Sequence, residues 1–271
     1  MGLYNNRIVV KVGTSTLTND AGKSDLRTTD RLACVLSDIQ NMGYEVVLVS
    51  SGAIAVGRNK LNMTAKPDSM RMKQAAAAVG QCSLMYLYDK FFGDYDKTVA
   101  QILLNADDIE EEEKKENLIN TFNALLEMGV IPIVNENDSV SYKEIESEDR
   151  LFGDNDMLSA VVAVLCRAKH LVIFSDIDGF YDHDPRLYPN AQLIDQIDTI
   201  DDSVYALAGG AGSRRGTGGM RTKLQAASLA TSQGTNTIVT NGKRPEVLYD
   251  IIKGGKAGTC LLYTSDAADE L

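Results

Sequence analysis

The sequence predicts an α/β protein, a three-layer αβα sandwich built around a mainly parallel central sheet. Strand-like and helix-like stretches alternate along the chain, as they do in a series of right-handed crossover units. Some of the strand-like stretches are continuous apolar runs, which is the pattern of strands buried on both faces. Polar or glycine-rich loops follow these runs. In a sheet of this kind, ligands bind beyond the carboxyl ends of the strands.

Each expected element rests on a local pattern. The first strand covers residues 7–12, and a helix follows over 29–42, with apolar residues at helical spacing and Gly43 as a stop. The run 45–50 is expected to be a buried strand, and 68–92 a long helix. The other expected elements alternate in the same way: strand 98–104, helix 116–128, strand 130–134, helix 155–169, strand 171–175, helix 219–233 and strand 237–240.

Composition narrows the functional classes. The chain has 271 residues, 44% hydrophobic and 24% charged, as in an ordinary soluble globular protein of one large or two small domains. Its net charge of -11 argues against non-specific binding to nucleic acid or to an anionic membrane. No signal peptide and no apolar run of transmembrane length are apparent, so we expect a cytoplasmic protein.

Cysteine and histidine chemistry is poorly supported. None of the four cysteines lies in a C-x-x-C pair or has the spacing of a zinc site. Only two histidines are present, and we expect one of them, His170, at the end of helix 155–169, where a cation suits the helix dipole.

Two loops, near opposite ends of the chain, have the pattern of phosphate binding. Gly216-Thr217-Gly218-Gly219-Met220 runs into a helix that carries Lys223 one turn in, so backbone N–H groups, the helix N-terminus and a lysine would surround an anion. At the other end of the chain, Lys11-Val12-Gly13-Thr14-Ser15 comes just after the strand-like run Ile8-Val9-Val10. Neither loop fits the Walker phosphate loop or the dinucleotide fingerprint, and either alone is compatible with a plain turn. Together they predict a phosphoryl group held between two lysines.

Polar loops also follow the strands at 45–50 and 130–134. In Ser50-Ser51-Gly52-Ala53, backbone N–H groups and the Ser51 hydroxyl suit a carboxylate or a phosphate. The four polar side chains of Asn135-Glu136-Asn137-Asp138 suit an ammonium group, although such residues also favour an ordinary turn.

Two further loops lie next to the later elements. Gly153-Asp154-Asn155-Asp156 leads into the helix 155–169 and has more Asp and Asn residues than helix capping needs. Ser175-Asp176-Ile177-Asp178-Gly179 follows the strand 171–175, where it would contact a nucleotide or form a turn closed by Gly179.

In type and order, these motifs resemble those of the glutamate 5-kinase branch of the amino acid kinase family. The resemblance covers nearly the whole chain up to Thr259 and implies the amino acid kinase fold, with residues 1–259 as the kinase domain. The motifs that carry it are KVGTS (11–15), SSGAIAVG (50–57), NEND (135–138), GDND (153–156), SDIDGFY (175–181) with DPR (184–186), and GTGGM (216–220) followed by Thr222 and Lys223.

The resemblance implies that ATP phosphorylates the γ-carboxylate of L-glutamate to γ-glutamyl phosphate, with Mg²⁺, in the first step of proline biosynthesis. It implies catalytic roles for Lys11, Lys223 and Asp156. The glutamate-binding positions it implies are Ser51, Gly52, Asn135, Asp138, Asp154 and Asn155. The implied ATP-binding positions are Lys11, Gly13, Ser175, Asp176, Gly216, Thr217, Gly218, Gly219, Met220 and Lys223. It also implies feedback inhibition by proline and assembly into dimers or tetramers.

The last residues do not fit this pattern. The segment 260–271 resembles the translation of a sequencing-library adapter, so we expect a non-native tail after Thr259; a genuine acidic tail is the alternative. The chain would then be a short form without the C-terminal PUA domain of many members, or a copy cut before that domain. Two other functions stay open: a related kinase acting on a different acid or a nucleotide, and a non-catalytic copy that binds ligands. The missing fingerprint disfavours a dinucleotide-binding protein.

Overall fold

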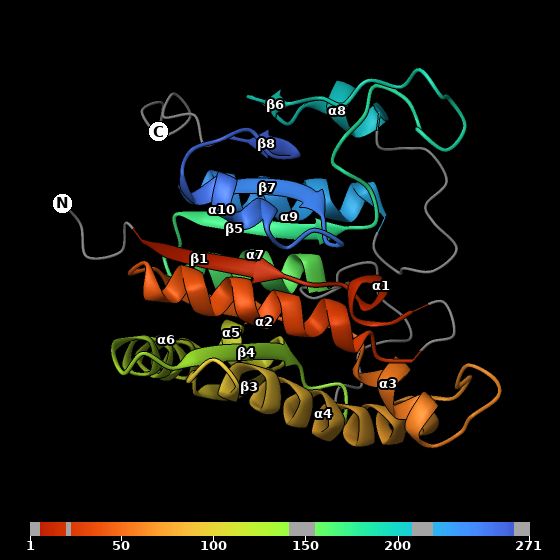
Figure 1. The fold of residues 1–271 in the computed structure, drawn as a ribbon, viewed down its shortest axis with the longest axis vertical. Coiled ribbons are helices and arrows are strands. Elements are labelled where there is room, and N and C mark those ends of the chain that lie inside the picture. The colour runs from red at the N-terminus through yellow and green to blue at the C-terminus, as the bar shows by residue number, and fades with distance from the viewer. Residues whose placement is uncertain (1–5, 20–22, 141–154, 208–218, 263–271) are drawn as a thin grey trace.

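The central sheet has eight strands and is parallel except at one pair. The computed structural model describes residues 6–19, 23–140, 155–207 and 219–262. Only β7 and β8 pair antiparallel in the described part of the sheet. The strand order across the sheet is β3 (Val99–Leu104), β4 (Ile131–Glu136), β2 (Glu45–Val49), β1 (Arg7–Lys11), β5 (His170–Ser175), β7 (Asn236–Asn241), β8 (Thr259–Leu261) and β6 (Gln196–Ile197). Figure 1 shows this stack from β3 near the bottom to β6 at the top.

Helices cover both faces of this sheet, because alternate strand residues point to opposite sides. On one face, Val9 and Val47 pack with α6 (Glu112–Glu127), α7 (Asn155–Leu165) and α9 (Met220–Ser232). On the other face, Ile8 and Val46 pack with α2 (Leu26–Asn41), α4 (Met70–Gly93) and α10 (Val247–Ile252). The predicted three-layer αβα sandwich with a mainly parallel sheet is therefore confirmed. The shorter helices are α1 (Thr14–Leu17), α3 (Ala53–Lys60), α5 (Asp107–Glu110) and α8 (Asp202–Leu207).

Two glycines let α3 and α4 cross in close contact. A Cβ atom added to Gly57 of α3 would overlap the backbone of Ala76, and one added to Gly80 of α4 would overlap the backbone of Ala53. This crossing holds the middle of α4 against the start of α3, which directly follows β2. The contact matters for the site because both helices supply residues to it.

The expected position of His170 is wrong. The helix that was predicted over 155–169 ends at Leu165, and Arg167 takes the left-handed conformation with φ 50°. His170 is instead the first residue of β5. Burial, helped by the nearby charge of Lys169, lowers the pKa of its imidazole to about 4, so the side chain is neutral at neutral pH.

The end of the chain contributes to the sheet. The predicted boundary after Thr259 falls inside β8, where Cys260 pairs with Ile238 and with Gln196. Leu261 is fully buried in the core. Residues 263–271 lie outside the described residues, and the domain boundary at Thr259 stays a prediction. None of the helices in the described ranges combines the length and the apolarity needed to cross a bilayer.

Candidate active site

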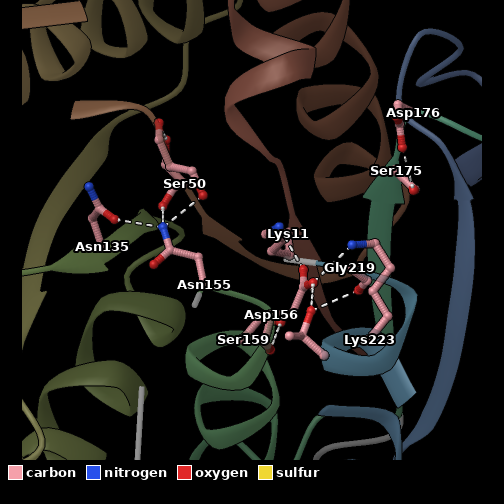
Figure 2. A network of polar contacts seen from close by, with 12 residues as sticks. Lys11, Ser50, Asn135, Asn155, Asp156, Ser159, Ser175, Asp176, Gly219 and Lys223 are labelled. Atoms are coloured by element: carbon pink, nitrogen blue, oxygen red, sulfur yellow. Dashed lines mark hydrogen bonds and ion pairs between the residues drawn. The ribbon is translucent and has the colours of Figure 1, made fainter. Parts of the chain in front are cut away.

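Four parallel strands end beside one another at a single edge of the sheet. Lys11 is the last residue of β1, Ser50 follows β2, Asn135 is near the end of β4, and Ser175 ends β5. Since these strands are parallel neighbours in the order β4-β2-β1-β5, their carboxyl ends meet there. Figure 2 shows the polar residues that gather at this edge.

Two lysines from opposite ends of the chain share one buried carboxylate. Lys11 Nζ lies 2.6 Å from Asp156 Oδ1, and Lys223 Nζ lies 2.9 Å from Asp156 Oδ2. The Asp156 side chain is fully buried, and each lysine side chain is only 9% exposed. Asp156 lies in the first turn of α7, where a negative charge is favoured by the helix dipole. The three groups form a rigid, nearly dry cluster.

The cluster has an excess of positive charge. Burial raises the pKa of the Asp156 carboxyl, but the ammonium groups of Lys11 and Lys223 outweigh that effect and lower it from 3.8 to about 2. Asp156 is therefore ionised at neutral pH. Together, the two ammonium groups and the one carboxylate of these three described residues carry a net charge of about +1, which suits an anionic ligand.

The start of α9 meets the same carboxylate. The Thr222 hydroxyl lies 3.1 Å from Asp156 Oδ2 and 2.9 Å from the Gly219 carbonyl, so it ties the first turn of α9 to α7. Gly219 is the N-cap of α9 and provides no side-chain cap. Met220 is the first residue of this helix. The positive end of α9 therefore lies next to Lys223, as the sequence predicted.

A second polar cluster is centred on Asn155, the residue before Asp156. Asn155 Nδ2 lies 2.7 Å from the carbonyl oxygen of Ser50, 2.7 Å from Ser51 Oγ and 3.0 Å from Asn135 Oδ1. Its amide group thus joins the start of α7 to the ends of β2 and β4. Because Asn155 and Asp156 are consecutive, this cluster and the lysine cluster are held at a fixed separation.

The loop after β2 requires a glycine. Gly52 has φ +91°, a left-handed conformation that favours glycine, and it is the N-cap of α3. Asp138 lines a small recess together with Ala53 of α3 and Gln81 of α4. The residues predicted from the 50–53 and 135–138 loops therefore lie on the same side of the site.

The remaining predicted positions lie on the other side of the lysine cluster. Ser175 and Asp176 end β5, with Ser175 Oγ donating to Asp176 Oδ1 at 3.3 Å, and Figure 2 places them opposite Asn135 and Asn155. A Cβ atom added to Gly13 would lie 3.6 Å from Lys11 Nζ, so this backbone directly adjoins the ammonium group. The predicted positions Asp154, Gly216, Thr217 and Gly218 lie outside the described residues.

Sequence reasoning missed two residues of α4. Gln81 Oε1 accepts a hydrogen bond from Asn135 Nδ2 at 2.9 Å, and the hydroxyl groups of Tyr88 and Ser50 lie 2.8 Å apart in a buried contact. Both residues belong to a long helix with an alanine-rich centre and have no motif around them. Their roles depend on contacts with strands that are far away in the sequence, so no local signal marked them.

The residues present fit Mg²⁺ as an ion carried by a phosphate ligand. Within the described ranges, no three acidic, histidine or cysteine side chains converge as a metal site. Mg²⁺ keeps much of its water and commonly binds through substrate phosphates with one or two carboxylates. Asp176, at the edge of the site, is a described carboxylate among the predicted ATP-binding positions.

Solved structures with this fold are kinases. The chain aligns with carbamate kinase from Giardia lamblia bound to AMP-PNP at 16% identity and a TM-score of 0.66, over 95% of this chain and 98% of the other. It aligns with UMP kinase from Ureaplasma parvum at 17% identity and a TM-score of 0.64, over 96% and 100%. At these identities the likeness concerns the fold alone.

The sequence profile of the amino acid kinase family matches residues 6–241, so the chain belongs to the amino acid kinase family. Within that family it is similar to curated glutamate 5-kinases. The protein from Clostridium perfringens is 56% identical over 93% of this chain and 94% of its own length. The one from Listeria innocua is 50% identical over 93% of this chain and 91% of its own length.

Proposed function

We propose that this chain uses ATP to phosphorylate the γ-carboxylate of L-glutamate, yielding γ-glutamyl phosphate, the first step of proline biosynthesis. The observation that carries the proposal is the pair of buried lysines on Asp156, placed directly beside the polar cluster of Asn155. The pair suits a phosphoryl group in transfer, and the cluster suits a small polar acceptor. The near full-length similarity to glutamate 5-kinases identifies that acceptor as glutamate.

The residues present suit an acceptor that is already an anion. A γ-carboxylate is deprotonated at neutral pH, so the transfer needs no general base. The barrier lies in bringing two anions together and in the charge that spreads over the phosphoryl oxygens. Lys11 and Lys223 supply fixed positive charge for that purpose, and Asp156 keeps both ammonium groups in place. Mg²⁺ bound with ATP neutralises further charge on the phosphates.

The two sides of the cluster receive different substrates in this proposal. Ser51, Gly52, Asn135, Asp138, Asp154 and Asn155 bind glutamate. Lys11, Gly13, Ser175, Asp176, Lys223 and the segment Gly216-Thr217-Gly218-Gly219-Met220 bind ATP. The support is the opposite placement of Asn135 and Ser175 about Asp156 in Figure 2, together with the motif resemblance.

The family resemblance supports four further proposals. We propose that residues 1–259 form the kinase domain, that the chain assembles into dimers or tetramers, that proline inhibits it at or near the glutamate site, and that it acts in the cytoplasm.

A hydroxamate assay tests the proposed function. Acyl phosphates react with hydroxylamine, whereas phosphate esters do not, so the full chain is incubated with ATP, Mg²⁺, hydroxylamine and one acceptor at a time. We expect product with L-glutamate and none with aspartate, acetylglutamate or carbamate. Lys223→Ala serves as the matched inactive control. Product with another acceptor in place of glutamate, or no product from a folded chain that binds ATP, would refute the proposal.

A further inference from the structure

We infer that Gln81 of α4 is a positioning residue for the acceptor subsite: its side-chain carbonyl holds Asn135, and through Asn135 it orients Asn155. The inference rests on the proposed function, since the subsite is the one assigned to glutamate. Three amide side chains form the relay, Gln81 to Asn135 at 2.9 Å and Asn155 to Asn135 at 3.0 Å.

The direction of the relay follows from a single backbone group. The carbonyl oxygen of Ser50 can only accept, so the amide atom of Asn155 that lies 2.7 Å from it must be the NH₂ group. The atom of Asn135 that faces this NH₂ group must then be Oδ1, which turns Asn135 Nδ2 towards Gln81. Gln81 must then accept this hydrogen bond with its side-chain carbonyl oxygen. Each amide therefore has one allowed orientation, provided that Gln81 supplies an acceptor.

The same orientation decides what Asn155 presents to a ligand. Its two N–H donors are shared among the oxygen atoms of Ser50, Ser51 and Asn135, and its carbonyl oxygen lies in the same amide plane on the other side of the side-chain carbon. That oxygen is an acceptor, which suits the ammonium group of an amino acid. If Asn135 lost its partner and rotated, Asn155 would lose one of the contacts that hold it in this orientation.

Burial makes the acceptor from Gln81 important. Asn135 is only 1% exposed, so its NH₂ group has little water to replace a missing partner. Gln81 follows Gly80, the residue at which α4 crosses α3 without room for a side chain. The backbone that carries Gln81 is thus fixed by packing, and its amide is held on a rigid element.

Kinetics of two Gln81 variants test the relay. Gln81→Met keeps the size of the side chain but removes the acceptor, and Gln81→Glu keeps an acceptor for Asn135. We expect Gln81→Met to raise the KM for L-glutamate about five- to thirtyfold, with the KM for ATP within about twofold, because only the acceptor side is disturbed. We expect Gln81→Glu to keep the KM for glutamate within about threefold of the value for the unsubstituted chain, because the acceptor for Asn135 is retained.

Two controls separate positioning from loss of structure. Gln40→Met makes the same chemical change on α2, where Gln40 Nε2 donates to the Gly129 carbonyl at an exposed contact, and should leave both KM values unchanged. In an Asn135→Ala background, Gln81→Met should have no further effect, since Gln81 acts through Asn135.

Several results would overturn the inference. These are an unchanged KM for glutamate in Gln81→Met, equal changes for glutamate and ATP, no rescue by Gln81→Glu, or full additivity with Asn135→Ala. Absence of glutamyl hydroxamate from the unsubstituted chain would instead refute the proposed function. In that event a crystal structure of Gln81→Met still decides the relay: a rotated Asn135 amide supports it, and an Asn135 amide unchanged in orientation contradicts it.

Discussion

Replacing Asp156 by Asn should damage stability and catalysis together. The variant removes the carboxylate that lies 2.6 Å from Lys11 Nζ and 2.9 Å from Lys223 Nζ, and it leaves two buried ammonium groups without the carboxylate that they share. In the unsubstituted chain, lowering the pKa from 3.8 to about 2 corresponds to stabilisation on the order of 2 kcal/mol. Because the folded pKa is the lower one, this stabilisation is complete well above pH 3.8 and is lost as the pH falls towards 2.

At neutral pH, we expect Asp156→Asn to lose more stability than the pKa shift alone indicates. Removing one partner from a buried ionic cluster costs about 3–5 kcal/mol, because the remaining charges stay buried without compensation. For a chain of this size, the corresponding fall in Tm is about 6–20 °C. We expect kcat to fall by about two to three decades, since the lysines that face the phosphoryl group are no longer held.

Thermal unfolding measures the loss of stability in Asp156→Asn. Repeating it with a non-hydrolysable ATP analogue and Mg²⁺ tests whether the positive charge of the two lysines causes that loss. The analogue should raise the Tm of Asp156→Asn by more than it raises that of the unsubstituted chain, because its phosphates compensate the positive charge of the two lysines that have lost their carboxylate. The matched control is Asp195→Asn, which breaks the exposed ion pair with Lys256 and should shift Tm by less than about 2 °C. A Tm within 2 °C of the unsubstituted chain and a kcat within about threefold would refute the reasoning.

Three further predictions address the two subsites and the helix crossing. Lys223→Ala or Lys11→Ala should lower kcat by about two to three decades in the hydroxamate assay, and a near-normal kcat with only a raised KM would contradict that role. Asp138→Ala should raise the KM for glutamate more than the KM for ATP, because Asp138 lines the recess beside the acceptor cluster; equal rises would count against it. Gly80→Ala should lower the free energy of unfolding in urea by about 1–3 kcal/mol, because the added Cβ overlaps the backbone of α3. Gly93→Ala, at the end of the same helix with open space around it, is the control, and similar stabilities for the two variants would contradict the crossing.

Much of the fold was predictable because most strands and helices have a local pattern of apolar residues that identifies them in the sequence. The central residues of β1, β2 and β5 are apolar, and helices lie between these strands in the sequence. Where an element was predicted wrongly or missed, contacts between distant segments determined the secondary structure. His170 was expected at a helix end because it follows an apolar helical stretch, but it is the first residue of β5, where it pairs with Ile8 of β1 and Asn236 of β7. The two-residue strand β6 and the antiparallel strand β8 are too short to give a periodic signal.

The candidate site was predictable to the extent that its residues lie in motifs. Lys11, Asn155 and Lys223 belong to motifs with more glycine and polar residues than turns and caps require, and the parallel topology brings these three residues to one edge of the sheet. Tyr88 and Gln81 were not predictable, because a helical residue that reaches a distant strand has the same local sequence context as any other.

The sequence by itself determined the alternation of strands and helices, the polar loops at their ends and the supply of two lysines for an anionic ligand, because these depend on local composition and spacing. Only the tertiary structure decided that Lys11 and Lys223 share the single carboxylate of Asp156, and that Gln81 accepts a hydrogen bond from Asn135 beside it. Those facts rest on distances of about 3 Å between segments far apart in the chain, and such distances exist only once the sheet and its helices have packed.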